Sequence, residues 1–570
     1  MGVVRMGDKS PRITSIRDFT GGLSYAPQAD NEFEEFVNLE PQRDGSALQR
    51  LGVWRLNDAA IGTAMPVGIG VVTAGNASYL VVAKTGTTWY RTPLVTPFPM
   101  VPSVGISRTF STLTVPDSPE DSAVRMESVI DLTGTNRAVF VSPSMVTTSW
   151  NGVGAPAALA GAPAGTYVRW HNKRLYIAIP PYTIRFCDKG DPLTWPATNT
   201  FDITGRFGAI TGLEAHPTSL IIFAERGILA MDGDPPDNVY VRVVHEDTGC
   251  EIPGSIATHG NTTIFMSYGN VYQLAGDVTL LSDRTSGRLP TIGVDLESVA
   301  LPTHAENSFA IATAHHYIVN INTNLTDQSP AVAFPGPQRL WVMSRRRPGQ
   351  WADWRYAIYT GAGNTVPFQS VICSPDESGF VIGSGDGGVY AQPFRTMQNY
   401  HPGFQIGVPD DRFDPYLQKY PHTTGRDVDF PDFSVDAVNS QGYSRGRTRR
   451  MSVGDPIIQK RMRRVLVSGV GNNVEVRVRL WPMIHTSSPP FYQPELGRFD
   501  TDTGELSSNF AQERVFRGLT LPCELNMGLD AGGGTFSEVQ VDVTGSSLWL
   551  KGINLVWSPS RVSALRGLGV

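Results

Sequence analysis

The sequence predicts an all-β protein in which a β-propeller is followed by a C-terminal β-sandwich-like domain. Three observations carry this prediction: many turn residues, a recurring pair of apolar runs, and alternating strands near the C-terminus. The chain has 570 residues, with 58 glycines and 42 prolines. That length exceeds one ordinary core, and the share of turn-forming residues is above the usual one. Many turns in a globular composition require many short strands, which excludes a helical bundle.

Residues 1–60 form an opening segment, which we expect to dock on the rest of the chain or to close the propeller. Asn31 followed by Glu34 has the spacing of a capping box. The apolar residues between Phe33 and Val37 would then share one face of a helix. We therefore predict a short helix in this segment.

Residues 61–395 repeat one unit, which is an apolar β-prone run, a turn and a second such run. The runs begin at Tyr79, Ala138, Leu175, Leu220, Thr263, Phe309 and Phe380. The central copies start roughly 45 residues apart, which is the period of four-stranded propeller blades. Because radial stacking covers both faces of each hairpin, we predict a closed propeller of five to eight blades. Two packed β-sandwiches are the alternative.

The rest of the chain departs from this repeat. Residues near 91–123 and 152–165 are rich in Pro, Ser, Ala and Gly, and we expect loop insertions there. Residues 396–462 are polar, first acidic and then basic, and we expect an irregular connector. Period-two alternation returns in residues 463–570, as from Val474 to Leu480, and predicts the C-terminal sandwich.

Motifs for catalysis or cofactor binding are weak. Gly383–Gly388 fits G-x-G-x-x-G, but an apolar strand follows where a dinucleotide site needs a helix, so a hairpin turn is predicted. Asp188–Asp191 and Asp232–Asp234 resemble calcium-loop fragments without the distal Glu. Zinc, serine-hydrolase and phosphate-loop patterns are absent from the sequence. We therefore expect no enzyme, catalytic residue, metal or cofactor, although paired carboxylates of a glycosidase would converge only in space.

Composition and cysteine usage limit the class further. A net charge of −6 argues against a global basic field for nucleic acid. No stretch reaches the ~18 apolar residues of a membrane span. Met1–Ser10 is charged and lacks an apolar run, so we expect no signal peptide and folding in a cytoplasm. The four cysteines are scattered singly, which favours incidental thiols: Cys187, Cys250, Cys373 and Cys523.

One stretch concentrates positive charge. Eight cations lie within twenty residues: Arg445, Arg447, Arg449, Arg450, Lys460, Arg461, Arg463 and Arg464. Such a patch can hold phosphates by releasing counterions. It can also be a solvated face or pair with an acidic neighbouring subunit. We predict that the run lies near a subunit interface or a channel.

Three motifs follow one another in the opening segment. They are FTGGL from Phe19, a D-N-E stretch from Asp30 that ends at Asn38, and GSALQRLG from Gly45. This order resembles the N-terminal signature of tail proteins from short-tailed bacteriophages. The residues that match, to which the resemblance gives a structural or docking role, are Phe19, Gly21, Gly22, Leu23, Asn31, Asn38, Gly45, Arg50 and Gly52. Blade motifs at 174–178, 190–195, 223–233 and 248–256 extend the resemblance over roughly residues 13–395.

The family is the tail nozzle, also called tail tubular protein B. The resemblance implies a non-catalytic virion protein, made in the host bacterial cytoplasm, that forms a homohexameric ring. The ring closes the tail channel and conducts genomic DNA during ejection, without sequence specificity. Its implied partners are further copies, the phage adaptor above, and tail fibre or tip proteins. A propeller glycosidase or polysaccharide-binding protein, and an intracellular propeller scaffold, are the alternatives.

Overall fold

The computed structural model describes residues 11–559 apart from internal gaps. The gaps are 18–21, 24–31, 38, 42–43, 50–53, 58–60, 63–65, 95–108, 121, 237, 268–269, 283–308, 321–337, 346–350, 357–367, 374–378, 385–386, 394–443, 449–450, 453–459, 482–511, 528–534 and 537. Strands make up 68% of the described residues, which also contain two short 3-10 turns at Gly205–Phe207 and Pro253–Ser255 and no α-helix. None of their helical segments has the length and hydropathy to cross a membrane.

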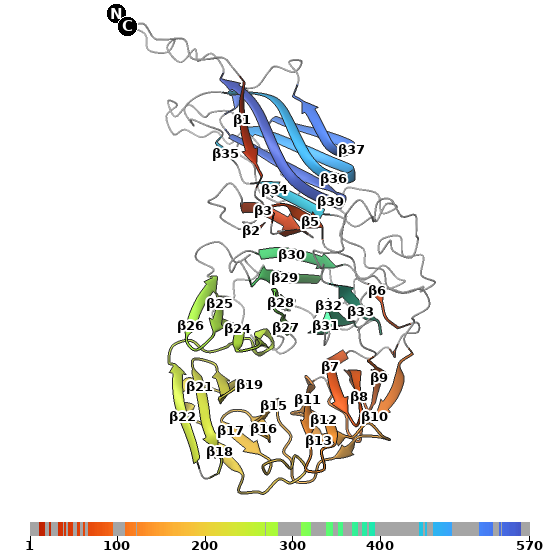
Figure 1. The fold of residues 1–570 in the computed structure, drawn as a ribbon, viewed down its shortest axis with the longest axis vertical. Coiled ribbons are helices and arrows are strands. Elements are labelled where there is room, and N and C mark those ends of the chain that lie inside the picture. The colour runs from red at the N-terminus through yellow and green to blue at the C-terminus, as the bar shows by residue number, and fades with distance from the viewer. Residues whose placement is uncertain are drawn as a thin grey trace, which may run out of the picture.

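Six separate four-stranded antiparallel sheets form a propeller (Figure 1). Five follow one another along the chain. They are β7 (Pro66–Ala74), β8 (Ala77–Lys84), β9 (Thr88–Pro93) and β10 (Ser111–Thr114); β11 (Arg125–Ile130), β12 (Asn136–Ser142), β13 (Met145–Trp150) and β14 (Ala157–Ala158); β15 (Tyr167–His171), β16 (Arg174–Ile179), β17 (Thr183–Phe186) and β18 (Thr200–Asp202); β19 (Ile210–Ala215), β20 (Ser219–Ala224), β21 (Ile228–Asp234) and β22 (Asn238–His245); β23 (Ala257–His259), β24 (Thr262–Ser267), β25 (Asn270–Leu274) and β26 (Val278–Ser282).

The last of the six sheets combines late strands with an early one. It contains β31 (Phe368–Cys373), β32 (Gly379–Ser384), β33 (Val389–Pro393) and β6 (Trp54–Arg55). Just after β6, the buried Asn57 side chain donates to the Gly387 carbonyl at 2.9 Å and accepts from the Val389 amide at 2.8 Å. The opening segment therefore closes the propeller against strands more than three hundred residues later.

A further group of four strands stands between the fifth sheet and the closing one. It consists of β27 (Phe309–Ala312), β28 (His316–Asn320), β29 (Gln338–Ser344) and β30 (Trp351–Tyr356), paired in the same consecutive order. Its inner strand β27 contacts both β23 and β31. Unlike the six separate sheets, this group continues beyond β30 into the C-terminal sheet. The predicted propeller with five to eight blades is confirmed.

The middle strands show why the blades leave a signal in the sequence. Every residue of β20 is buried. Leu220 and Ile222 pack in one apolar cluster, toward the third sheet, whereas Ile221 and Phe223 pack in another, toward the fifth. A strand covered on both faces must be apolar at successive positions rather than at alternate ones. The recurring apolar runs of the sequence are such strands.

The C-terminal domain is one sheet that curls into a half-barrel. Its long strands are β36 (Lys460–Trp481), β37 (Gln512–Asn526) and β39 (Glu538–Pro559), with β34 (Ser444–Thr448), β35 (Met451–Ser452) and β38 (Thr535–Phe536) beside them. The pairing of β36 with β39 shifts register at several bulges, and bulges bend a strand. At Gly469 (φ 155°) a Cβ would lie 2.0 Å from the Trp549 carbonyl oxygen, so the bend requires glycine.

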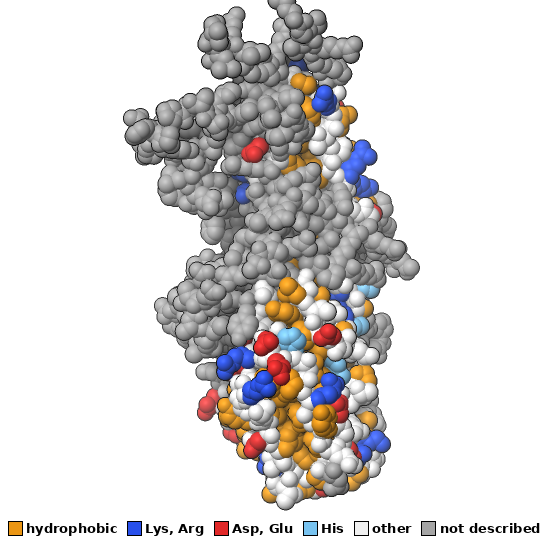
Figure 2. Space-filling view, turned by 90° about the vertical axis from the view of Figure 1, so that its left-hand side faces the viewer, with side chains coloured by type: hydrophobic (Ala, Val, Ile, Leu, Met, Phe, Trp, Pro, Cys, Tyr) orange, Lys and Arg blue, Asp and Glu red, His pale blue; other side chains and the backbone are white. Residues whose placement is uncertain are grey.

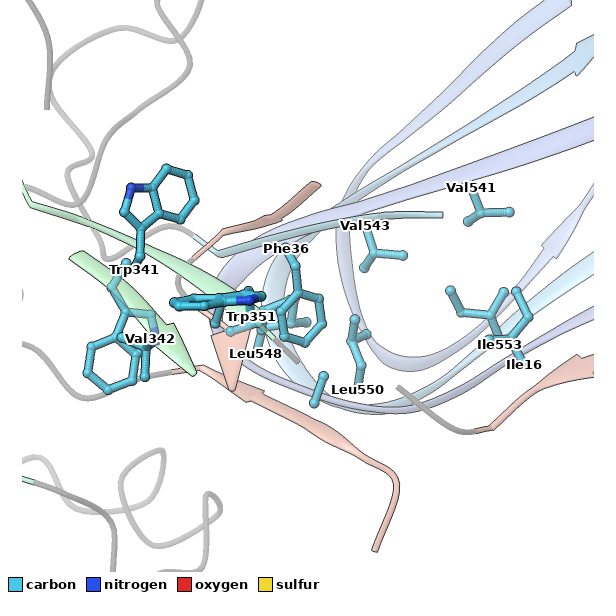
Figure 3. Packing of buried hydrophobic residues seen from close by; sticks show 14 of the residues in the cluster. Ile16, Phe36, Trp341, Val342, Trp351, Val541, Val543, Leu548, Leu550 and Ile553 are labelled. Carbon is cyan, nitrogen blue, oxygen red and sulfur yellow. The ribbon is translucent and has the colours of Figure 1, made fainter. Parts of the chain in front are cut away.

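The opening segment joins the two parts of the molecule. β1 (Arg12–Ile16) and β5 (Ala47–Gln49) pair with β39, and β5 also pairs with the short β4 (Leu39–Pro41). β2 (Gly22–Leu23) pairs with β30, and β3 (Glu32–Val37) pairs with β34. Figure 3 shows Phe36 of β3 and Trp351 of β30 beside Leu548 of β39, where one apolar core runs through the joint.

The helix predicted around Phe33–Val37 is wrong, because this stretch is strand β3. Phe36 is fully buried, and β3 has partners on both sides, β2 and β34. Tertiary pairing of this kind overrides a local capping signal.

Three predicted irregular regions also contain strands. Residues 91–123 hold β10, and 152–165 hold β14, each at the outer edge of its sheet. The end of 396–462 holds β34, β35 and the start of β36. These two outer strands are exposed and carry mostly polar or small residues, so they resemble loops in sequence. Residues 394–443 lie outside the described part.

Candidate functional site

The innermost strands of three successive propeller sheets share a charged cluster. Arg169 on β15 donates to Glu214 on β19 through Nη2, at 2.5 Å, and through Nε, at 3.2 Å. Its Nη1 lies 3.4 Å from Glu127 Oε2 on β11. These strands belong to different sheets and share no backbone ladder. One guanidinium therefore connects three sheets through side chains.

Burial and mutual charge set the protonation of this cluster, which we name the inter-sheet cluster (Glu127, Arg169 and Glu214). Burial, with a further contribution from Glu214, raises the pKa of Glu127 to about 7, although Arg169 opposes the shift. Burial disfavours the charge of Arg169, but Glu214 and Glu127 outweigh it and raise the pKa of that guanidinium. Arg169 therefore stays charged, and Glu127 titrates near neutral pH.

A cleft of about 750 Å³ opens beside the cluster, two residues further along the same strands. Its lining includes His171 after Arg169 and His216 after Glu214. Alternate residues of a strand face the same side. The cluster and the two histidines therefore follow one another along β15 and past the end of β19.

The two histidines are neutral at neutral pH. Burial lowers the pKa of His171, and the neighbouring His216 adds to this effect. Burial also lowers the pKa of His216, although Glu214 opposes it. His216 Nε2 lies 2.9 Å from Thr263 Oγ1, which in turn lies 2.7 Å from Thr258 Oγ1. These contacts hold the His216 ring against the fifth sheet.

Of the aspartates that resembled calcium-loop fragments, Asp232 and Asp234 hold cationic side chains, whereas Asp188 and Asp191 accept hydrogen bonds from neutral groups of their own turn. Asp234, in the cleft lining, accepts from Arg174 Nε at 2.8 Å and from Lys189 Nζ at 2.6 Å. Burial opposes the shift, but these bonds lower the pKa of Asp234. Asp232 pairs with Arg242 at 2.8 Å and accepts from Ser219. In the described ranges no group of three or more His, Cys, Asp or Glu is placed to hold a metal ion.

The structure divides the predicted basic patch. Arg445 and Arg447, on β34, are buried against Asp542 of β39, at 2.6 and 3.3 Å. Lys460 is also fully buried, with its ammonium 5.9 Å from the centre of the Trp557 ring. The run is therefore divided between buried and exposed residues, because strand register places Arg447 opposite Asp542 inside the sheet.

The remaining members of the run lie on β36 or outside the described residues. Arg461, Arg463 and Arg464 are exposed. Arg463 Nε donates to Ser558 Oγ at 3.0 Å, and Arg464 pairs with Glu524 at 2.7 Å. Arg449 and Arg450 are outside the described part.

The described residues of the three opening-segment motifs lie in the joint between propeller and half-barrel. Gly22 and Leu23 form β2, where Leu23 pairs with Trp351. Gly45 (φ 85°) makes the turn before β5, and the next residue, Ser46, accepts from Trp549 Nε1 at 2.9 Å. The signature residues outside the described part are Phe19, Gly21, Asn31, Asn38, Arg50 and Gly52.

Two further sequence interpretations can be placed. β32 ends at Ser384 and β33 begins at Val389, so the glycine-rich stretch joins two strands of a hairpin, as predicted. Burial raises the pKa of Cys187 to about 11 and of Cys250 to about 12. A thiol with so high a pKa is unreactive at neutral pH.

The inter-sheet cluster matches no catalytic or binding motif, although the sequence contains a signal for it. Glu127, Arg169 and Glu214 each stand in the first strand of a blade, roughly 45 residues apart. Charged residues that recur with the blade period indicate side chains that meet on the inner strands.

Comparison with known proteins identifies no family. No family profile matches the chain, and no curated protein matches it. One solved structure that matches is the crystal structure of Chaetomium thermophilum Raptor, with 12% identity and a TM-score of 0.37. The match covers 61% of this chain and spans only 30% of that one. A similarity at this level says nothing about function.

Proposed function

We propose that this chain is a structural virion protein, the tail nozzle of a short-tailed phage. In this proposal, copies of the chain form a ring, expected to be a hexamer, that closes the tail channel and conducts genomic DNA during ejection. The observation that carries the proposal is the ordered signature of the opening segment. Its described residues Gly22, Leu23 and Gly45 lie where the propeller meets the half-barrel, so they suit a structural role.

A conduit must keep its shape under load, and several features suit this need. The opening segment closes the propeller through Asn57, and it pairs with the half-barrel through β1, β3 and β5. Arg169 adds a side-chain connection between three sheets. A net charge of −6 would weakly repel DNA phosphates and so favour passage.

A ring also needs a surface on which copies can meet. β22 is the outermost strand of its sheet and is exposed along most of its length, with Tyr240 at 66% exposure. Three valines of the same strand are also exposed: Val239, Val241 and Val243. Figure 2 shows the side on which β22 lies, with hydrophobic side chains among charged ones. Exposed apolar edge strands favour association, and we assign this strand to contacts between neighbouring copies.

The exposed cations of β36 are a second candidate for contact with neighbours or DNA. Arg461 and Arg463 point away from the core, unlike Arg445 and Arg447. In the proposal, they line the channel or an interface. Replacing both with Ser would then lower assembly or genome retention, and wild-type titre and particle stability would count against this role.

Electron microscopy of the purified protein beside intact particles tests the proposed function. We expect a ring with rotational symmetry that matches a ring in the tail, together with the protein in the particle proteome. A monodisperse monomer with no copy in particles would refute the proposal.

The enzyme alternative, a propeller glycosidase, needs two carboxylates that act from either side of a glycosidic bond. Glu127 and Glu214 are close to one another but share the guanidinium of Arg169. This arrangement suits a connection between sheets better than acid–base chemistry. Products released from surface polysaccharide at catalytic rates by the purified chain would favour the enzyme instead.

A further inference from the structure

The cleft beside the inter-sheet cluster is built from turns of neighbouring sheets. Asn172 comes from the β15–β16 turn, and His216 and Thr218 come from the β19–β20 turn. Asp234 and Asn238 flank the β21–β22 turn. Turns of this kind can vary in sequence while the sheets hold them in place, and binding residues concentrate in such loops.

The polar groups that line the cleft are either neutral or, in the case of Asp234, already paired with cations. Asp234 is held by Arg174 and Lys189, so its carboxylate is engaged with two cations. His171 and His216 have lowered pKa values and are neutral at neutral pH. Asn172, Thr218 and Asn238 are exposed in the lining and bring amides and a hydroxyl that both donate and accept.

We propose that this cleft binds a saccharide. Sugar rings present many hydroxyls, each a donor and an acceptor, which match neutral amide, hydroxyl and imidazole groups. His171 adds a flat imidazole ring to the lining, whereas the neighbouring Trp170 side chain packs on the apolar cluster toward the second sheet. A volume of about 750 Å³ lies within the usual range of small-molecule sites.

The chemistry of the cleft stands apart from the proposed nozzle function. Only the choice of bacterial-surface saccharides as probes rests on that function. Absence of the protein from phage particles would refute the nozzle and leave a measured saccharide affinity unchanged. Absence of saccharide binding would refute the cleft proposal and leave a ring in the tail unchanged.

Binding is tested with the purified full-length chain and fluorescently labelled oligosaccharides. The probes are released by mild acid from bacterial lipopolysaccharide and capsule, and fluorescence anisotropy follows their binding. Thr218→Trp fills the cleft and should weaken binding at least about tenfold. The matched control is Thr114→Trp on β10, which is exposed on another sheet and should leave the affinity unchanged.

A second variant guards against misfolding of the first. Asn172 has φ 47°, so Asn172→Gly keeps the backbone conformation while it removes the amide. We expect several-fold weaker binding with unchanged thermal unfolding. Equal affinity of the wild type and both cleft variants would overturn the proposal. So would displacement of the probe by inorganic phosphate, which would indicate an anion site, or a lack of saturable binding by every oligosaccharide.

Discussion

Two charge clusters, one in the propeller and one in the half-barrel, have opposite compositions. In the propeller, Arg169 lies between two carboxylates, Glu127 and Glu214. In the half-barrel, Asp542 lies between two guanidiniums, those of Arg445 and Arg447. The central Arg169 side chain is 33% exposed, whereas the Asp542 side chain is 2% exposed.

The two clusters also differ in what they connect. Asp542 faces Arg447 across a backbone ladder that already joins β34 to β39. Arg169 bridges strands of three sheets that have no ladder between them. Removing a partner from a dry cluster leaves an uncompensated charge, whereas water can reach a partly exposed one. The half-barrel cluster should therefore dominate stability, and the inter-sheet cluster should govern how firmly the blades pack.

The largest effect is expected for Asp542→Asn. This change removes the negative charge that Arg445 and Arg447 share inside the sheet, and it should lower the unfolding free energy of the half-barrel by about 3–5 kcal/mol. Denaturant unfolding measures the loss. The matched control is Glu524→Gln, which removes a surface partner of Arg464 and should change stability by no more than about 1 kcal/mol. Similar unfolding of both variants would break the comparison.

Arg169→Met should have a smaller effect on the propeller. It leaves Glu127 facing Glu214 without their shared cation, but Arg169 is partly exposed and water replaces some of the lost contacts. We expect a loss of about 1–3 kcal/mol, together with faster hydrogen exchange in β11, β15 and β19. If exchange increased evenly over the whole propeller, the cluster would have no special part in joining these sheets.

The pH dependence of stability should isolate Glu127. Its pKa is raised from 4.5 to about 7, so the folded state binds this proton more tightly than the unfolded chain. The contribution of Glu127 is therefore fully present below about pH 4.5 and is lost as pH rises through about 7. Glu127→Gln should flatten the stability profile in this window, as measured by thermal unfolding at several pH values. An unchanged profile would contradict the assignment.

Asp131 provides a third case, in which one carboxylate serves a single hairpin. Burial opposes ionisation, but hydrogen bonds from Thr133, Arg137 and Thr135 lower the pKa of Asp131 to about 2. Its stabilising contribution is present above about pH 3.8 and is lost as pH falls through about 2. Asp131→Asn should cost about 1–2 kcal/mol at neutral pH, seen by denaturant unfolding. If Asp131→Asn lowered the unfolding free energy as much as Asp542→Asn, a carboxylate within one hairpin would contribute as much to stability as one shared by two buried guanidiniums.

Tyr240→Lys on β22 should change stability least, by about 0.5 kcal/mol or less, because Tyr240 is mostly exposed. Its effect should fall on assembly, which light scattering measures as a loss of the ring. Thr279→Lys on β26 is the control for added surface charge. A ring that survives Tyr240→Lys would remove β22 from the interface and leave the two clusters as they are.

The sequence predicted the blades best where strands are covered on both sides. The runs at Leu220 and Thr263 are middle strands, β20 and β24, which are buried along almost their whole length and hold three or more successive apolar residues. Prediction failed at β10 and β14, which are exposed edges, and at β3, where a capping pattern indicated a helix. At β3 the deciding contact comes from β34, far along the chain, whereas β10 and β14 pair with the preceding strands β9 and β13 but are too exposed and too short to give a clear apolar pattern.

The amino-acid sequence alone determined the repeated hairpin. A strand buried between two sheets needs apolar residues at successive positions, and this pattern can be seen locally in the sequence. Tertiary structure decided the role of each charge. Arg445 and Arg461 belong to one basic run, yet the first is buried on Asp542 and the second is exposed. The environment of a charge depends on the strands that the fold brings beside it. Asp542, the partner of Arg445, lies about a hundred positions further along the chain.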